Sequence, residues 1–460
     1  QIYIKCIIVV IFLIMCLVHI IVLNNNMEGF ENSTLLNTTF DFKDCNRTET
    51  NSCLFTNIYL YNHTFYILCN ESDINNKEII NKLDKLHLYS YGGSIFNYKL
   101  ITNTHFDTLM YESFEKIKTL CVRYNTAWRH NPGHALWDSL YSIYVVLLCY
   151  KLGEEDFYNI LFEEEKEDNG WLNRLEQSTN FIKTFSGQDN RYFKKKAFKK
   201  NTLYCFDKLV TGIGKIGQRI YEYPVTLNIP GNSKYNAVIK FVKRFYKKYN
   251  IGEHVKKNNN IKNIIIIDNK RFTDKDKQVF KNIINKFTND KSISIKYINF
   301  KDIPSFKDQL NLILNTDIYI SSVGTSLMLH PFLRPGSIVI NLGEPYKTDS
   351  SIKNYDIVSK YWESYMCEST NYLKCDYYKH KKFTHDISYN EDYLIELIKN
   401  NIQNINNYAI PVLKKKNLPE ESKKFIDYCD KENCKDTIDD MNSFNMDKWH
   451  CKSDAWIESI

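Results

Sequence analysis

The strongest constraint on the fold is an alternation of short apolar runs with helix-like segments between residues 263 and 342. The run from Asn263 to Asp268 reads Asn-Ile-Ile-Ile-Ile-Asp, which is typical of a strand that is buried on both faces. Strands are predicted at 263–268, 293–298, 317–321 and 337–342, and helices at 274–287, 303–314 and 325–332. This alternation favours an α/β fold built on a parallel, doubly wound sheet.

Chain length and local breaks indicate more than one domain. At about 100–200 residues per domain, a chain of 460 residues forms two or three. Pro224, Pro230 and Gly231 interrupt the pattern near residues 225–235. We therefore expect an N-terminal domain at 85–230 and a C-terminal domain at 235–400. The other predicted elements are a helix at 135–152, a solvated helix at 156–175, a strand with a glycine-containing loop at 203–217 and a basic helix at 237–249.

The first residues of the chain predict a transmembrane signal anchor at 2–23. Cys6 to Leu23 is apolar except for His19, and its eighteen residues would rise about 27 Å as a helix. That length approaches the roughly 30 Å of the hydrocarbon core of a bilayer. A cleaved signal peptide is the alternative, but its apolar region is shorter, at about 7–15 residues.

The segment at 24–84 is predicted to be a glycosylated stem or capping region on the lumenal side of the membrane. It is rich in Asn, and its Asn-x-Ser/Thr acceptors are Asn32, Asn37, Asn46, Asn62 and Asn70. The net charge of +7 is mild for this length and does not indicate a nucleic-acid partner.

Cysteine usage agrees with an oxidising compartment, where thiols form disulfides. The chain has thirteen cysteines. We expect disulfides among those outside the anchor, chiefly Cys45, Cys53, Cys69, Cys367, Cys375, Cys429, Cys434 and Cys451. The tail at 401–460 is expected to pack back on the domains. A zinc cluster of His380 and His385 with nearby cysteines is a weaker alternative, because the spacing departs from the usual patterns.

One candidate catalytic segment runs from Arg129 to Asp138. Pro132 and Gly133 break the chain just before an apolar helix, so His134 lies near the start of that helix and Asp138 lies one turn further on the same face. Such a pair can take a proton from a hydroxyl or hold it. A capping or core histidine beside an exposed aspartate is the structural alternative.

A second candidate segment runs from Thr316 to Leu327, where a strand ends in small hydroxyl residues and Gly324 before a predicted helix. Backbone N–H groups at such a turn can bind phosphate oxygens. Arg271 follows the strand at 263–268, where a guanidinium can pair with a diphosphate. An ordinary capped turn and a surface arginine are the structural alternatives.

In their order along the chain, these segments resemble glycosyltransferase family 61. This family includes plant xylan-decorating xylosyl- and arabinosyltransferases and N-acetylglucosaminyltransferases of the endoplasmic reticulum. The matching segments, which span about residues 120–345, are Asn131-x-x-His134-x-x-x-Asp138, Ile264 to Arg271, Phe306 to Leu310, Asp317 to Leu327 and Phe332 to Ile340.

The resemblance implies a GT-B-like fold, in which two Rossmann-like domains face a cleft. It implies an inverting transferase that moves a sugar from a UDP-sugar to a glycan or glycoprotein, with no metal or other cofactor. His134 would be the general base or the partner of the acceptor hydroxyl, with Asp138 orienting it, unless the pair only positions the substrate. The residues expected to hold the donor are Arg271, Gly324, Thr325, Ser326 and His330, and those expected to contact the acceptor are Arg129 and Asn131. With the anchor, this places the catalytic domain in the lumen of the Golgi or endoplasmic reticulum.

One departure from the family lies in the turn. The family reads His-Gly-Ala-Gly-Leu there, whereas this chain has Val323, Gly324, Thr325 and Ser326 before Leu327. His330 is therefore the candidate to replace the missing histidine, unless it is only a packed helix residue. The alternative function is a membrane-anchored glycoprotein that keeps the fold but binds glycans without catalysis.

Overall fold

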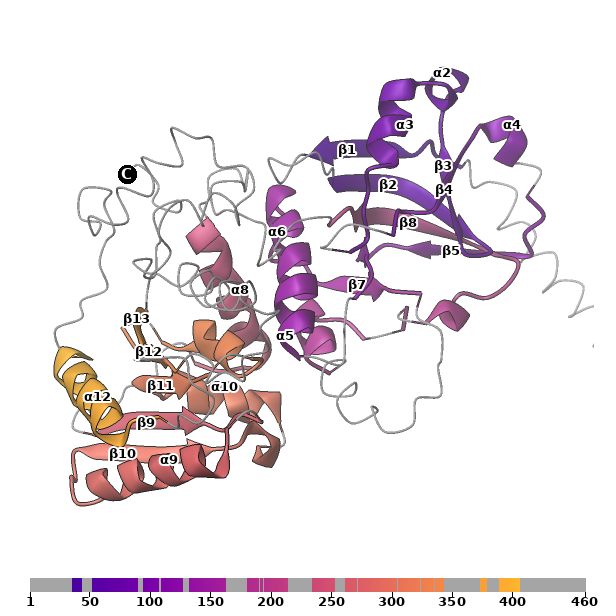
Figure 1. The fold of residues 1–460 in the computed structure, drawn as a ribbon. Helices are drawn as coiled ribbons and strands as arrows, with labels where there is room; N and C mark the ends of the chain where they lie inside the picture. The colour runs from indigo at the N-terminus through magenta and orange to yellow at the C-terminus, as the bar shows by residue number, and fades with distance from the viewer. Residues whose placement is uncertain are drawn as a thin grey trace, which may run out of the picture.

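The computed structural model shows an α/β protein with two sheets of mostly parallel strands and helices between them (Figure 1). It describes residues 35–43, 52–89, 94–106, 109–126, 132–162, 180–189, 191–192, 194–213, 234–252, 261–270, 272–303, 305–322, 324–334, 336–342, 373–378 and 389–405. We call 35–213 the N-terminal domain and 234–405 the C-terminal domain.

The C-terminal domain contains a five-stranded parallel sheet in the order β10-β9-β11-β12-β13. This is a doubly wound order: β10 is added on one side of β9, and β11, β12 and β13 are added on the other side, so the strand order reverses between β9 and β11. The elements of this domain are α8 (Lys234–Lys248), β9 (Lys262–Ile267), α9 (Asp274–Phe287), β10 (Ile293–Ile298), η4 (Phe300–Asp302), α10 (Phe306–Leu314), β11 (Ile318–Ser321), η5 (Leu327–Phe332), β12 (Ile338–Asn341), β13 (Lys374–Tyr377) and α12 (Glu391–Ile405). The predicted parallel sheet is confirmed.

Alternate side chains of β9 cover the two faces of this sheet, because successive residues of a strand point to opposite sides. Ile264 and Ile266 pack with α9 and α12, whereas Ile265 and Ile267 pack with α8, α10 and η5. The second face also contacts the N-terminal domain through the same apolar cluster. The continuous Ile run is therefore needed to bury both faces.

The N-terminal domain contains a mixed sheet in the order β4-β3-β2-β8-β6-β7, with β1 beside β2 and β5 beside β8. Its elements are β1 (Thr39–Lys43), β2 (Ser52–Tyr61), β3 (Thr64–Leu68), α2 (Glu71–Ile74), α3 (Lys77–Leu83), β4 (Tyr98–Ile101), α4 (Asn103–Phe106), β5 (Ser113–Ile117), β6 (Leu120–Arg123), α5 (Pro132–His134), the π-helix η1 (Ala135–Leu140), α6 (Tyr141–Cys149), β7 (Phe157–Ile160), η2 (Lys195–Ala197) and β8 (Thr202–Thr211).

The sheet corrects the expected domain boundary at residue 85. Strand β2 pairs antiparallel with both β3 and β8, and its side chains Phe55, Ile58 and Leu60 are fully buried. The segment at 52–83 is therefore part of the N-terminal domain and not a stem. The antiparallel pairs also make this sheet less Rossmann-like than expected.

A second correction concerns the predicted solvated helix at 156–175. Residues 157–160 form strand β7, which pairs in parallel with β6 at the edge of the sheet. Phe157, Asn159 and Ile160 of this strand are buried. Their burial explains why a short strand forms beside a charged segment.

The helical segment at 132–149 lies between the two sheets (Figure 1). Its part at 135–147 is buried on all sides, as expected for a helix that is apolar around its whole circumference. On one side it packs with Val122 and Val210 of the N-terminal sheet, and on the other with Phe241 of α8 and Phe332 of η5. This segment therefore joins the two domains.

Buried free thiols replace two of the expected disulfide cysteines. Cys53 and Cys69, which we expected in disulfides, are free and buried, as are Cys121 and Cys205. Burial raises the pKa of Cys205 to about 11, which keeps the thiol protonated and unreactive at neutral pH. These side chains pack like small apolar residues. The other cysteines named above lie outside the described residues or, for Cys375, have no described side chain.

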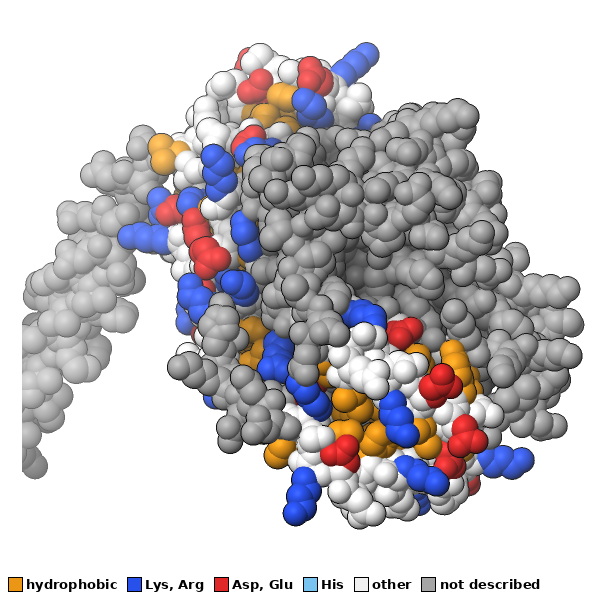
Figure 2. All heavy atoms as spheres, turned by 90° about the vertical axis from the view of Figure 1, so that its left-hand side faces the viewer, with side chains coloured by type: hydrophobic (Ala, Val, Ile, Leu, Met, Phe, Trp, Pro, Cys, Tyr) orange, Lys and Arg blue, Asp and Glu red, His pale blue; other side chains and the backbone are white. Residues whose placement is uncertain are grey.

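Several other expectations fall on residues outside those described, namely the anchor at 2–23, Asn32, Asn46 and most of the tail at 401–460. Within the described ranges, no helix is both long and apolar enough to cross a bilayer. Asn37, Asn62 and Asn70 are exposed. Figure 2 shows basic and acidic side chains interspersed with hydrophobic ones over the described part of the C-terminal domain.

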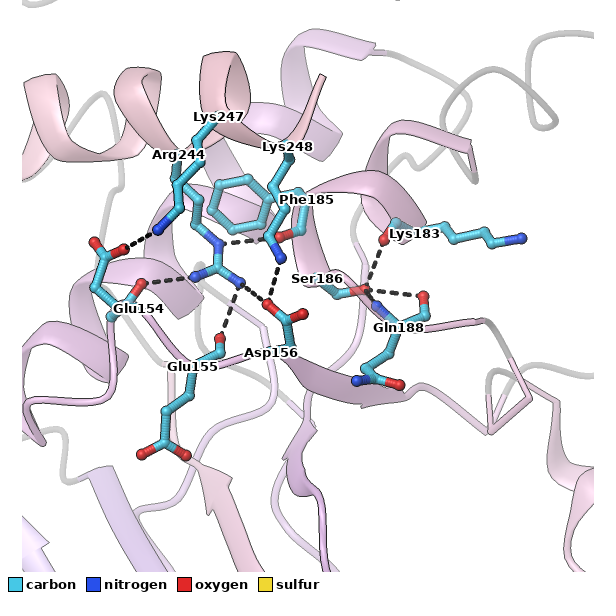
Figure 3. A network of polar contacts seen from close by, with 11 residues as sticks. Glu154, Glu155, Asp156, Lys183, Phe185, Ser186, Gln188, Arg244, Lys247 and Lys248 are labelled. Atoms are coloured by element: carbon cyan, nitrogen blue, oxygen red, sulfur yellow. Dashed lines mark hydrogen bonds and ion pairs between the residues drawn. The ribbon is translucent and has the colours of Figure 1, made fainter. Parts of the chain in front are cut away.

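Helix α8 is attached to the N-terminal domain by a buried arginine (Figure 3). The Arg244 guanidinium donates to the carbonyl oxygens of Phe185 (3.0 Å), Gly153 (2.7 Å) and Glu155 (2.9 Å). Only 3% of Arg244 is exposed, and burial lowers its pKa. Each of these carbonyl groups would lose its donor if the guanidinium were removed, and the bonds to Phe185 and Gly153 are buried.

We predict that Arg244→Met lowers the free energy of unfolding by about 3 kcal/mol or more, since three acceptors lose a charged donor. Lys247→Met is the matched control on the same helix. The Lys247–Glu154 pair (3.2 Å) is exposed, so its loss costs at most about 1 kcal/mol. Urea denaturation measures both, and equal effects would contradict a special role for Arg244.

A histidine lies in the tight turn between β2 and β3. Asn62 and His63 both have positive φ angles, of 45° and 65°, as in a two-residue type I′ hairpin. Burial, and then the nearby charges of Lys195 and Lys200, lower the pKa of His63. The unfolded chain therefore binds a proton at this residue at a higher pH than the folded protein does.

We predict that the neutral form of His63 contributes its full stability to the fold above about pH 6.5, the ordinary pKa of histidine. This contribution is lost as pH falls below that value, because the unfolded chain binds the proton first. His63→Asn tolerates the positive φ and removes the titration. Between about pH 7.5 and about pH 5, the free energy of unfolding should decrease more for the wild type than for the variant. An equal fall would rule out His63 as the cause.

Candidate active site

The candidate site lies at the carboxyl end of the C-terminal sheet, between β9 and β11. These strands are adjacent, with Ile266 opposite Ile320, and the strand order reverses between them. Loops on the two sides of such a reversal leave in opposite directions, and ligands of doubly wound sheets bind in the crevice that results. Asp268 follows β9 at this edge, and Ser322 follows β11.

The turn after β11 is braced by its own side chains. The Tyr319 hydroxyl donates to the Ser326 carbonyl, and the Ser321 hydroxyl is 3.1 Å from that of Ser326. Gly324 has a φ of 135°, in a region that side chains disfavour. Gly324, Thr325 and Ser326 are all partly exposed, as residues that contact a ligand must be.

The helix after this turn differs from the expected one. In place of a helix at 325–332, the structure has the six-residue 3₁₀-helix η5, which contains Pro331. So short an element adds little helix dipole to the turn. Any phosphate contacts would therefore come chiefly from the N–H and hydroxyl groups of Gly324, Thr325 and Ser326.

His134 and Asp138 form a direct pair at the start of the interdomain helix. Imidazole Nδ1 contacts Asp138 Oδ2; the His134 side chain is 20% exposed and that of Asp138 is fully buried. A carboxylate accepts hydrogen bonds, so Nδ1 is the donor and Nε2 is the nitrogen that can take a proton. The Tyr141 N–H bonds to the Leu136 carbonyl, five residues back, as in a π-helix.

Trp137 joins this helix to the turn after β11. Its indole Nε1 donates to the carbonyl of Met328 in η5 at 2.8 Å. Its ring lies 5.3 Å from Phe241 and 6.3 Å from Phe332. Met328 is four residues from Gly324, and Trp137 is three residues from His134, so the two candidate segments lie on neighbouring elements.

His330 is placed inside η5 rather than at the surface. It is 1% exposed, and its Nδ1 lies 2.7 Å from the Leu327 carbonyl. A histidine held in this way fixes the fold of η5, and its contact with a donor stays a prediction. Arg271, Arg129, Asn131 and Val323 lie outside the described residues, so their expected roles also stay predictions.

One carboxylate at the carboxyl end of β9 was not predicted as a site residue from the sequence. The Asp268 oxygens accept hydrogen bonds from the Tyr297 hydroxyl and from Asn299 Nδ2 (3.1 Å). Burial and the adjacent Asp268 raise the pKa of Tyr297, which keeps its hydroxyl protonated and donating. The signal was present in the sequence, because a polar residue directly follows a fully apolar strand.

Asp274 and Asp276 have the Asp-x-Asp spacing that binds metal ions in some glycosyltransferases, and sequence-based prediction overlooked them. Here they begin α9, and Asp276 Oδ2 accepts from Thr273 N and Oγ1, both at 2.8 Å, in a capping box. Asp276 is 1% exposed. Asp276 therefore has a structural role in a helix cap.

A surface hollow of about 430 Å³ is separate from this site. It lies in the N-terminal domain and is lined by Ile80, Asp84, Phe96, Asn97, Tyr98 and Leu100. None of the candidate residues contributes to it.

Comparison with models of protein families and with curated proteins finds no match for this chain.

We predict that Gly324→Ala lowers the free energy of unfolding by about 1–3 kcal/mol, because a side chain at its φ of 135° is strained. Gly252→Ala is the control, since an added Cβ there meets nothing within 4 Å. Thermal or urea unfolding of both variants measures the difference. Equal stability would show that the turn relaxes without cost.

Proposed function

We propose that this chain is an inverting, metal-independent glycosyltransferase that moves a sugar from a UDP-sugar to a hydroxyl of a glycan or glycoprotein. The proposal rests on the resemblance to glycosyltransferase family 61. It includes a GT-B-like arrangement in which the two domains face one cleft. It also includes an N-terminal anchor that holds the catalytic domain in the lumen of the Golgi or endoplasmic reticulum.

One observation carries the proposal: an imidazole–carboxylate pair lies on the helix that contacts the element after the β11 turn. His134 and Asp138 belong to one candidate segment and Gly324 to Ser326 belong to the other, and Trp137 links them through Met328. The sequence separates these segments by almost two hundred residues. A base and a phosphate-binding turn on neighbouring elements are what transfer from a nucleotide-sugar requires.

In the proposed reaction, His134 Nε2 takes the proton of the acceptor hydroxyl while its oxygen attacks the anomeric carbon. The bond between that carbon and the diphosphate oxygen breaks, and its electron pair leaves with UDP. Arg271, with the N–H and hydroxyl groups of Gly324, Thr325 and Ser326, stabilises the charge on the departing diphosphate. Arg129 and Asn131 contact the acceptor.

Asp138 positions the imidazole in this scheme. Because its carboxylate is fully buried against Nδ1, it fixes the tautomer in which Nε2 is the base. The Ser142 hydroxyl donates to the Asp138 carbonyl at 3.2 Å, and the surrounding helix is packed on all sides. The pair is therefore held in place before any substrate binds.

The test is a screen of the full chain against a panel of UDP-sugars, with release of UDP as the readout. We predict that His134→Ala lowers kcat by about 10²–10⁴-fold, and that Asp138→Asn lowers kcat with little change in KM. His105→Ala is the control, because His105 lies in α4, which is on the opposite side of the N-terminal domain from α5 (Figure 1), and contacts Thr102. Added EDTA should leave the rate unchanged.

The outcomes separate the proposal from its main alternative. A wild-type protein that binds glycans but releases no UDP from any donor would be a non-catalytic glycan-binding glycoprotein. Transfer that survives His134→Ala unchanged would assign the base to another residue. Loss of transfer on removal of metal ions would overturn the metal-independent part of the proposal.

A further inference from the structure

Asp268 occupies the edge of the sheet where the proposed nucleotide would lie. It follows β9, its N–H donates to the Ile298 carbonyl of the neighbouring β10 at 2.7 Å, and it is partly exposed. Extending the β9–β11 register by two residues sets Asp268 opposite Ser322. The residue therefore lies between the end of β10 and the turn that begins after β11.

The Asp268 carboxylate is held by neutral donors from one side only. The Tyr297 hydroxyl donates to Oδ1 and the Asn299 amide donates to Oδ2. Within the described residues, it forms no ion pair. A carboxylate has about four acceptor sites, so two of them remain for a ligand, and their direction is fixed by Tyr297 and Asn299.

The charge of this group determines which part of a nucleotide it can meet. A carboxylate repels the diphosphate, so the phosphates belong on the side of Gly324 to Ser326. Hydroxyl groups donate well to an ionised acceptor, and the two vicinal hydroxyls of a ribose can donate to one carboxylate at once. An acidic side chain at the edge of a doubly wound sheet fills this role in dinucleotide-binding folds.

We propose that Asp268 binds the ribose hydroxyls of the nucleotide and so selects ribonucleotides over their 2′-deoxy forms. This inference rests on the proposed function, since it assumes a nucleotide in the crevice. It orients the ligand across the sheet, with the ribose over β9 and β10 and the diphosphate over the turn after β11. Tyr297 and Asn299 are positioning residues that hold the carboxylate.

The test compares the affinities of the full chain for UDP and for 2′-deoxy-UDP by isothermal titration calorimetry. The wild type should prefer UDP by about tenfold or more, because a hydrogen bond to a charged group is lost with the 2′-hydroxyl. Asp268→Asn should bring the two affinities to within about threefold of each other, mainly through weaker UDP binding.

Asp290→Asn is the matched control. Asp290 lies before β10, at the opposite end of the sheet, and its carboxylate accepts hydrogen bonds from Ser292 N and Oγ. This variant should therefore keep the wild-type preference for UDP. Tyr297→Phe should reduce the preference only in part, since Asn299 still holds the carboxylate. This variant also provides a second readout if Asp268→Asn is unstable in thermal unfolding.

The results separate this inference from the function on which it rests. A wild type that binds neither nucleotide overturns both. A wild type that binds UDP, with an Asp268→Asn protein that keeps the same preference, overturns the role of Asp268 and leaves the transferase proposal standing. Equal affinity of the wild type for both nucleotides also rejects ribose selection.

Discussion

The burial of one apolar helical segment between two sheets is the constraint on which the structure depends. Residues 132–149 form a helical segment without a solvent-exposed polar face, so it is stable only if both domains cover it. The N-terminal sheet covers one side, and α8 and η5 cover the other. Each domain therefore completes the core of the other. His134 and Asp138 are positioned by this packing rather than by a flexible loop.

The same packing explains how two distant segments come to share a site. Trp137 is almost fully buried, and its indole N–H donates to the Met328 carbonyl in η5. Tyr246 of α8 donates to the Phe332 carbonyl at the end of η5. Hydrogen bonds from two other helices therefore hold both ends of η5. A short 3₁₀-helix has little stability of its own, so these contacts fix the turn that precedes it.

Much of the C-terminal domain could be predicted from the sequence, because β9, β11 and β12 are largely buried and read as short apolar runs rich in Ile. The N-terminal domain could not. The central strand β2 was missed because it lies within the segment predicted to be a stem. That prediction was based on the neighbouring Asn-x-Ser/Thr acceptors. The β7 strand was missed because four residues between charged segments give no clear period. The expectation of a disulfide framework for Cys53 and Cys69 also did not hold, because an apolar interior accommodates a thiol as readily as a methyl group.

The candidate site was predictable in part. The pairing of His134 with Asp138 follows from helical spacing, and the carboxyl ends of β9 and β11 follow from sheet topology. The Trp137–Met328 contact depends on tertiary packing, which one sequence does not reveal. The clamp on Asp268 by Tyr297 and Asn299 needed the order β10-β9-β11 to be known first.

The π-helix between His134 and Tyr141 has a further consequence. Its hydrogen-bonded turn contains one residue more than that of an α-helix, so it acts as a one-residue insertion in an otherwise regular helix. Removing that residue would let an α-helix form, but everything before it would rotate by about 100° around the axis. The imidazole would then leave its present direction while the buried face of α6 stayed in place. The irregular turn thus sets the direction of His134 relative to the buried face of α6.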